Sequence, residues 1–174
     1  MDRKAEPAEP TPWVRTILIG RNPGFTLVRI VVLVITCFIV SKFVLRPIRI
    51  EGISMFPTYK DRHINFINRL AYWSHEPERG DVVGIRPGPG ESIMYLKRIV
   101  GLPGEEIAFH HGHVVVNGQV LPEPYLVERS DWEIPAVKVG PDEYFVVGDN
   151  RSMNKADHTF GRTHRERIVG RILL

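Results

Sequence analysis

The chain has 174 residues, of which 43% are hydrophobic and 25% charged, and its formal net charge is +3. This length suits one domain of ordinary size with a small appendage, and the composition is that of a folded protein. The 23 Lys and Arg residues are spread along the chain without a dense basic helix or a basic stripe with interleaved aromatics, which argues against nucleic-acid binding.

The first 45 residues contain a polar tail and an apolar segment. Residues 1–24 include four prolines and predict a short, poorly ordered tail. In residues 25–45 the uncharged centre, Ile30 to Ser41, is shorter than the roughly 20 residues that a membrane span needs. Arg29 and Lys42 flank this centre, and long cationic side chains can extend to the membrane interface, which restores the required length. We therefore expect a retained transmembrane anchor over residues 25–45.

Two alternatives for this segment remain. A buried core helix is disfavoured because no polar face repeats through the centre, as it would in an amphipathic helix. A cleaved signal peptide is disfavoured because no small-residue cleavage site follows Lys42. The segment also contains Cys37, which is the chain's one cysteine, so an intrachain disulfide is excluded.

Basic residues flank the apolar segment on both sides. The positive-inside rule, applied to these charges alone, does not place the C-terminal part outside the cytoplasm. The charges on the C-terminal side instead indicate a basic face near anionic lipid. The N-terminal group is Arg15, Arg21 and Arg29, and the C-terminal group is Lys42, Arg46, Arg49, Lys60 and Arg62.

From residue 46 onward the pattern changes to short runs of period two, separated by Gly and Pro. Pro47 ends any helix, and Asn117-Gly118 is a strong hairpin signal. Many short strands with such turns predict an all-β barrel or sandwich over residues 46–174. The expected strands are residues 48–51, 63–67, 79–83, 94–100, 106–109, 114–116, 120–121, 136–139, 143–147 and 168–174, with a polar loop at 148–161.

Residues 52–58 (GISMFPT) place a serine on a stiff, apolar loop. Glycine permits a close backbone approach, and proline fixes φ and removes a donor. Met55 and Phe56 follow the serine directly and are expected to be exposed. Ser54 is therefore a candidate nucleophile, but a serine at its own pKa is weak and needs a base beside it.

The histidines are the first candidates for that base, and none lies in a setting as constrained as the serine loop. His110, His111 and His113 crowd a predicted hairpin turn. His111 and His113 share a strand face while His110 points away, and a metal site would also need a fourth, convergent partner. We favour an exposed turn here over a metal site.

Lys97 is the other candidate base. In residues 95–100 (YLKRIV), alternation places Tyr95, Lys97 and Ile99 on one face of a strand. Burial there would lower the pKa of the amine, as a base requires, because an unperturbed lysine is almost wholly protonated at pH 7. The alternative is an amphipathic lysine that covers a sheet edge, which is the commoner fate of a strand lysine.

Four blocks, in this order, resemble the motifs of the bacterial type I signal peptidases, the membrane-anchored serine proteases that remove signal peptides from exported proteins. The resemblance covers residues 25–174, and residues 117–118 and 123–126 also fit the intervening hairpin of that family. The four blocks are residues 52–58 (GISMFPT), 79–83 (RGDVV), 95–105 (YLKRIVGLPGE) and 147–151 (VGDNR).

The resemblance implies a Ser-Lys dyad without a metal or cofactor. Ser54 would attack the scissile carbonyl, Lys97 would take its proton, and the same amine would activate the water that hydrolyses the acyl-enzyme. The implied cut follows small residues in an Ala-x-Ala-like pattern, and Met55, Phe56 and Tyr95 are the expected substrate contacts.

The implied fold is mainly β, with an N-terminal transmembrane helix followed by a coiled β-barrel catalytic domain over residues 46–174. The expected partners are the signal peptides of exported preproteins and the lipid bilayer. The expected location is the inner membrane, with one span and the catalytic domain on the extracytoplasmic side.

The sequence departs from the family pattern at the oxyanion hole. Many members carry a serine two residues before the nucleophile that donates to the oxyanion, and Gly52 stands there instead. The backbone N–H of Ser54 can still donate.

The last block departs further. Asn154 stands at the position of a serine near the lysine, where its carbonyl oxygen could accept from the amine. Asp157 and His158 are expected to replace a structural ion pair, and a contact made by His158 would titrate near neutrality. Asp149 and Arg151 are expected to brace the loop against the strand.

Other functions remain open at this point. A specialised peptidase that processes pilins or conjugation factors would use the same dyad on other substrates. A catalytically dead, membrane-tethered β-domain would bind exported chains or partners, and the intact Ser54 and Lys97 argue against it. A soluble Ser-Lys self-cleaving repressor is disfavoured, because the apolar segment replaces the DNA-binding helices of such a protein.

Overall fold

The structure is a computed structural model that describes residues 23–88 and 94–173. The chain divides into two compact units, Met1–Lys42 and Phe43–Leu174. Most of the predicted polar tail lies outside the described residues.

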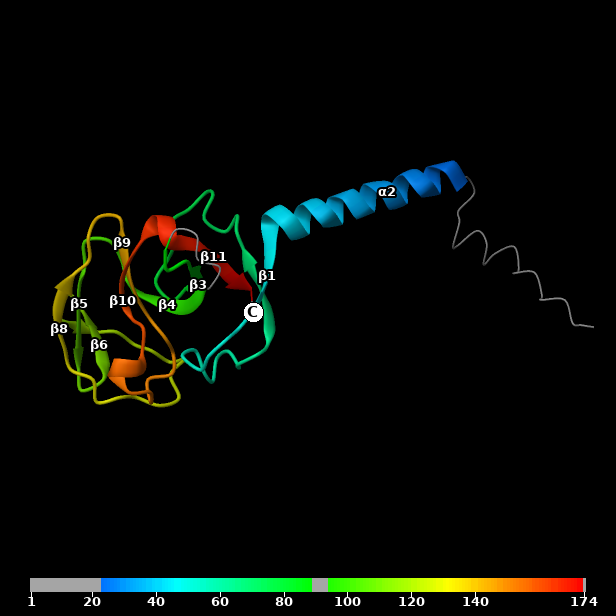
Figure 1. Cartoon of the computed structure of the whole chain (residues 1–174). Helices are drawn as coiled ribbons and strands as arrows, with labels where there is room; N and C mark the ends of the chain where they lie inside the picture. Colours follow the sequence, from blue (N-terminus) through cyan, green and yellow to red (C-terminus); the bar gives the residue numbers. More distant parts are fainter. Residues whose placement is uncertain (1–22, 89–93, 174) are drawn as a thin grey trace, which may run out of the picture. The chain divides into compact units, whose positions relative to one another are not determined.

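The first unit contains helix α2, Pro23–Ile39, which continues into a π-helical turn, Val40–Val44 (Figure 1). Proline is favoured in the first turn of a helix, where its missing N–H has no intrahelical partner. Gly24–Val44 is long and apolar enough to cross a membrane. Its large side chains are exposed, including Phe25, Leu33 and Phe38. An apolar surface of this kind suits a lipid environment.

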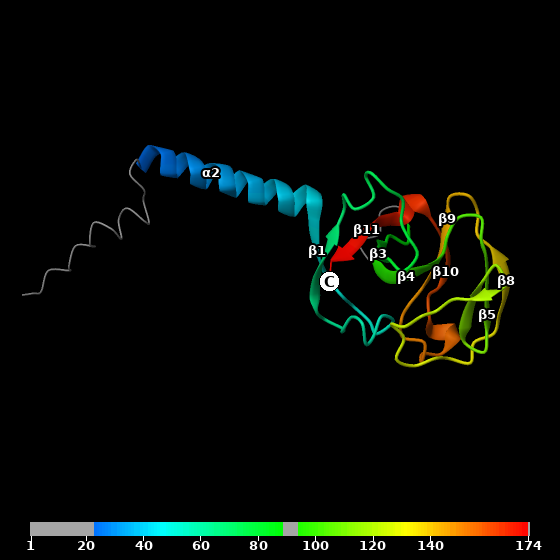
Figure 2. The ribbon, with the colours of Figure 1, turned by 180° about the vertical axis from the view of Figure 1, so that it is seen from behind.

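The second unit is built from two antiparallel sheets (Figures 1 and 2). The larger sheet has the order β1-β2-β11-β3-β4-β9-β10 and the smaller has the order β7-β6-β5-β8. The strands are β1 Leu45–Arg49, β2 Ile64–Asn68, β3 Val82–Ile85, β4 Tyr95–Gly101, β5 Glu106–His110, β6 His113–Val116, β7 Gln119–Val120, β8 Ile134–Lys138, β9 Glu143–Val147, β10 Gly161–His164 and β11 Ile168–Leu173.

Strand β1 contains Pro47 and lies at the edge of the larger sheet. An edge position tolerates proline because its missing N–H need not face a partner strand. The sequence missed β10, whose residues Gly161–His164 (GRTH) lack an apolar alternation. This strand forms by pairing with β9, where Thr163 lies opposite Tyr144.

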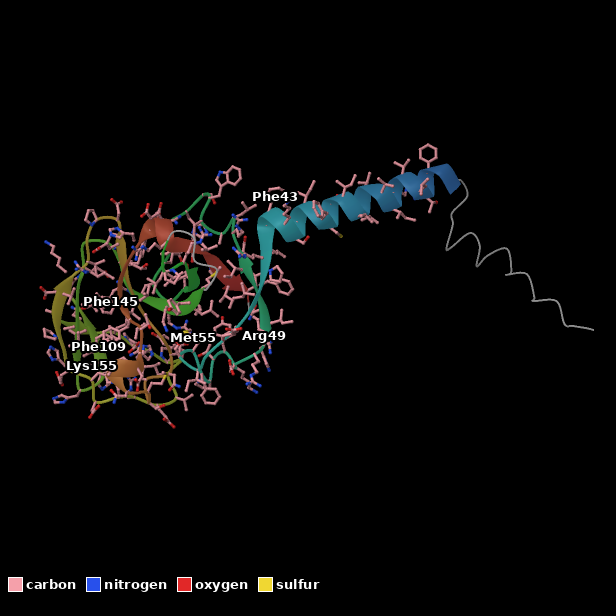
Figure 3. The ribbon with its side chains drawn as sticks, in the orientation of Figure 1. Phe43, Arg49, Met55, Phe109, Phe145 and Lys155 are labelled. Carbon is pink, nitrogen blue, oxygen red and sulfur yellow. The ribbon has the colours of Figure 1, made fainter. Side chains whose placement is uncertain are left out.

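The core of the second unit consists of three apolar clusters, so the predicted mainly β fold with one N-terminal apolar helix is confirmed. Phe109 and Phe145 belong to the cluster between the two sheets, and Met55 belongs to a second cluster beneath the serine loop (Figure 3). The burial of each such side chain stabilises the folded unit by roughly 1.5–3 kcal/mol. The second cluster anchors the loop that carries Ser54.

Candidate active site

The serine loop leaves the larger sheet after β1 and returns at β2. Ile50 closes its base, because its N–H donates to the carbonyl of His63 at 2.9 Å and its carbonyl accepts from the N–H of Arg62 at 2.8 Å. Gly52 has a φ of +98°, which favours glycine, and its N–H donates to Asp61 Oδ1 at 2.9 Å. These bonds fix the backbone on the N-terminal side of Ser54.

A second loop, residues 148–152, holds the serine from the other side. The N–H of Asn150 donates to the carbonyl of Ser54 at 3.0 Å, and its side-chain Nδ2 donates to the carbonyl of Ile53 at 3.0 Å. Gly148 lies so close that a Cβ there would be 2.2 Å from the Ser54 carbonyl oxygen. The Ser54 N–H itself has no hydrogen-bond acceptor among the described residues, so it is free to donate to another oxygen.

Lys97 reaches the serine from β4, a central strand between β3 and β9. Its side chain is buried, with 3% of the residue exposed, and its Nζ lies 2.8 Å from Ser54 Oγ. Burial lowers the pKa of the amine to about 8, and the negative charge of Asp149 opposes this shift. About one molecule in ten therefore carries a neutral amine at pH 7, against about one in several thousand for an exposed lysine.

This lowered pKa predicts an alkaline rise in activity. If Lys97 is the base, it acts only when unprotonated, so kcat/KM should rise about tenfold per pH unit below pH 8 and level off above it. Peptide cleavage measured between pH 6 and pH 10 would check this. A flat profile between pH 6 and pH 8 would rule out Lys97 as the titrating base.

Arg98 follows Lys97 on β4 and connects three segments. Its Nε and Nη2 donate to the two carboxylate oxygens of Asp149, at 2.8 and 2.6 Å. The hydroxyl of Thr58 donates to the same carboxylate at 2.7 Å. A bidentate guanidinium–carboxylate pair is geometrically specific. The serine loop, the strand of Lys97 and the 148–152 loop are therefore joined through one carboxylate.

A second ion pair lies beneath the 148–152 loop. Arg151 Nη2 lies 2.6 Å from Glu123 Oε1, and both side chains are wholly buried. Arg151 Nε also donates to the carbonyl of Gly148 at 2.8 Å, and the Tyr125 hydroxyl donates to Glu123 at 2.7 Å. The Arg151 charge is thus placed by a carboxylate that the sequence did not single out.

The three predicted substrate contacts differ in exposure: Met55 is buried, whereas Phe56 and Tyr95 are exposed. The prediction that Met55 is exposed is wrong: only 2% of it is accessible, because its apolar side chain packs into the core below the loop. Phe56 and Tyr95 are 49% and 39% exposed.

The altered part of the last block is organised by a local cap. Asn154 Oδ1 accepts from the N–H of Ala156 at 3.0 Å and begins the 3-10 helix Lys155–Asp157. The expected bond from Asn154 to the lysine amine is therefore not formed, since a cap satisfies that oxygen locally. Asp157 is exposed in this short helix.

His158 is buried, and the ion pair predicted between it and Asp157 is not formed. Its ring lies 5.0 Å from that of Trp132, and neither ring nitrogen has a hydrogen-bond partner among the described residues. Burial first, and then the nearby cations Lys97 and Arg151, lower the pKa of His158 to about 4. The imidazole is neutral at pH 7 and does not titrate near neutrality there.

The histidine-rich turn lies away from these groups. His110 and His111 are exposed, and their Nδ1 atoms lie 3.2 and 3.3 Å from the carboxylate of Glu133. Within the described part of the chain, no three His, Cys, Asp or Glu side chains are arranged to hold a metal ion.

Arg98, Glu123 and Asn150 are the supporting residues that sequence inspection missed. Arg98 lies beside Lys97 in the third block, and Asn150 lies in the fourth, so their motif positions were visible. Their partners depend on contacts between residues far apart in the chain, which strand periodicity cannot indicate.

The chain is similar in sequence to known proteins. The model of the family "Signal peptidase, peptidase S26" matches residues 25–174. The chain is 35% identical over 153 residues to a probable signal peptidase I-2 of Synechocystis, covering 85% of this chain and 69% of that protein. It is 34% identical to signal peptidase I T of Bacillus subtilis, covering 81% and 78%. A crystal structure of a signal peptidase I from Enterococcus faecalis aligns with 25% identity and a TM-score of 0.46, over 56% of this chain and 97% of that one.

Proposed function

The chain belongs to the signal peptidase family, peptidase S26, and we propose that it removes signal peptides from exported preproteins with Ser54 as nucleophile and Lys97 as general base. Family membership supports a serine endopeptidase of the signal peptidase I kind. The observation that carries the proposed mechanism is the 2.8 Å approach of a buried amine, Lys97 Nζ, to Ser54 Oγ.

In the first half-reaction the neutral amine of Lys97 accepts the hydroxyl proton as Ser54 Oγ attacks the scissile carbonyl. The carbonyl oxygen becomes an oxyanion, and the Ser54 N–H, which has no other acceptor among the described residues, donates to it. Gly52 contributes no hydroxyl, so any further donor must come from elsewhere. The ammonium of Lys97 then gives its proton to the leaving amine, and an acyl ester on Ser54 remains.

In the second half-reaction the same amine takes a proton from water, which attacks the ester. The proton returns to Ser54 Oγ as the C–O bond breaks, and the signal peptide leaves with a free carboxylate. The 148–152 loop keeps Ser54 in place through both steps, because Asn150 binds the backbone of Ile53 and Ser54. Precise placement of this kind contributes strongly to rate.

The proposed substrates carry small residues before the cut, in an Ala-x-Ala-like pattern. The exposed Phe56 and Tyr95 are proposed to contact the substrate. Residues 25–45 are proposed to anchor the chain in the inner membrane, and residues 46–174 to form an extracytoplasmic catalytic domain. A reporter that is active only in the cytoplasm, fused after Leu174, should therefore be inactive. Reporter activity would show that the catalytic domain lies in the cytoplasm and would contradict this proposal.

The experiment that tests the proposed function is direct. The purified full chain, in detergent or lipid, is incubated with a preprotein that has one Ala-x-Ala-like site, and the products are located by mass. We expect a single cut after the final small residue. A matched preprotein with bulky residues at those positions should stay intact. A catalytically dead tether would leave both uncut, and a cut elsewhere would contradict the proposed specificity.

A further inference from the structure

A cavity of about 180 Å³ adjoins the dyad on the side of Lys97. It is lined by the ends of β3 and β4, by β9, and by β10 with the two residues before it. These four strands are neighbours in the larger sheet (Figure 1). Lys97 and Tyr95 line it, whereas Ser54 does not. Lys97 therefore adjoins both the nucleophile and this cavity.

The other polar groups around the cavity are mostly cationic. Arg86, Arg162 and Arg167 line it, and the N–H of Arg86 donates to the carbonyl of Arg167 at 2.9 Å, so these two residues adjoin. Arg86 and Arg167 form no ion pair with the described residues, although Glu166 lies beside them at a neighbouring hollow. The guanidinium of Arg162 lies 3.5 Å from Glu143.

Thr163 gives a second, independent indication of a ligand. It lines the same cavity, is 6% exposed, and its hydroxyl has no hydrogen-bond partner among the described residues. Buried hydroxyls are almost always bonded, so an unpartnered one beside a cavity is typical of a place that water or a ligand completes.

The proposed reaction indicates which part of the substrate lies beside this cavity. Lys97 must protonate the amine that leaves, so that nitrogen has to lie within hydrogen-bond reach of Nζ. The leaving amine is the new N-terminus of the product, and the residues that follow it begin beside Lys97. We propose that the cavity receives the first residues after the cut, and that its arginines favour an acidic side chain there. This inference rests on the proposed function and extends it to the other side of the scissile bond.

The test uses two peptides that share every residue up to the cut and carry either Glu or Gln within the first two positions after it. Glu and Gln match in shape, so their kcat/KM ratio reports charge. In detergent at low salt, the wild-type chain should cut the Glu peptide about three- to fivefold faster, which is the range for partly exposed charge pairs. The preference should lie mainly in KM and shrink as salt is added.

The variant Arg86→Gln/Arg167→Gln should bring the ratio to about one. The matched control Arg69→Gln/Arg129→Gln removes two exposed arginines elsewhere and should keep the wild-type ratio. A wild-type ratio of one, with both peptides cut, would overturn the inference and leave the proposed function standing. Failure to cut either peptide would instead count against the function itself.

A lipid phosphate is the competing ligand for these arginines. If they bound lipid, the peptide ratio would be one in detergent, and the double variant would lose affinity for vesicles that contain anionic lipid. That pair of results would overturn the substrate assignment. A ratio that persists in detergent, with unchanged vesicle binding by the double variant, would support it.

Discussion

Replacing Ser54 or Lys97 with alanine should reduce preprotein cleavage by roughly 10³-fold or more. Ser54→Ala removes the proposed attacking oxygen, and Lys97→Ala removes the buried nitrogen 2.8 Å from it. If the two act as a unit, as proposed, the double variant should be little worse than either single one. Initial rates of cleavage with a purified preprotein would measure these effects.

Ser74→Ala and Lys138→Ala are matched controls, since both residues are exposed and lie outside the site. Each should keep the wild-type rate. Thermal melting of every variant separates lost chemistry from lost folding. Normal cleavage by either dyad variant would remove the Ser-Lys mechanism from consideration.

Glu123→Gln should lower the stability of the second unit by about 3–5 kcal/mol, because it leaves the guanidinium of Arg151 buried and uncompensated. For a unit of this size that corresponds to a fall in Tm of about 11–18 °C. The same change should slow cleavage, because Arg151 Nε holds the carbonyl of Gly148 beside the serine loop. Melting in detergent and initial rates would measure the two effects separately.

Glu128→Gln is the control, since Glu128 is exposed and close in sequence. The double variant Glu123→Leu/Arg151→Met removes both buried charges and should regain at least half of the lost stability, although the Gly148 carbonyl then lacks its donor. A loss below about 1 kcal/mol in Glu123→Gln would show that this buried pair contributes little.

The sequence predicted those parts of the fold that depend on local pattern. Alternation located most strands, and the apolar run 25–45 located the helix, because side-chain periodicity directly reflects burial. It missed β10, whose pairing with β9 is decided by the partner strand rather than by its own apolar residues. It also misjudged Met55, because an apolar loop residue can face either the core or the solvent without a change in pattern.

At the candidate site the sequence predicted Ser54 and Lys97 as the reactive pair. In the structure, Lys97 Nζ and Ser54 Oγ lie within hydrogen-bond distance. Strand alternation alone left Lys97 open between a buried base and a covering side chain. Lys97 is buried because β4 is a central strand of the sheet, and the order of strands in a sheet cannot be read from a single sequence. The partners of Asp149 and Arg151 lie 51 and 28 residues away in the chain, so their ion pairs could not be predicted from spacing.

The crowding around Gly148 limits which residues of this loop can be replaced. A methyl group there would meet both the Ser54 carbonyl oxygen and the His158 ring, at 2.2 and 2.7 Å, so even alanine would displace the nucleophile. Each of the three residues that follow it contacts a residue far away in the chain. Residues 152–157, in contrast, are largely exposed, and Asn154 caps the short helix among them. Substitutions within residues 152–157 should therefore be tolerated better than substitutions at Gly148 or the three residues that follow it.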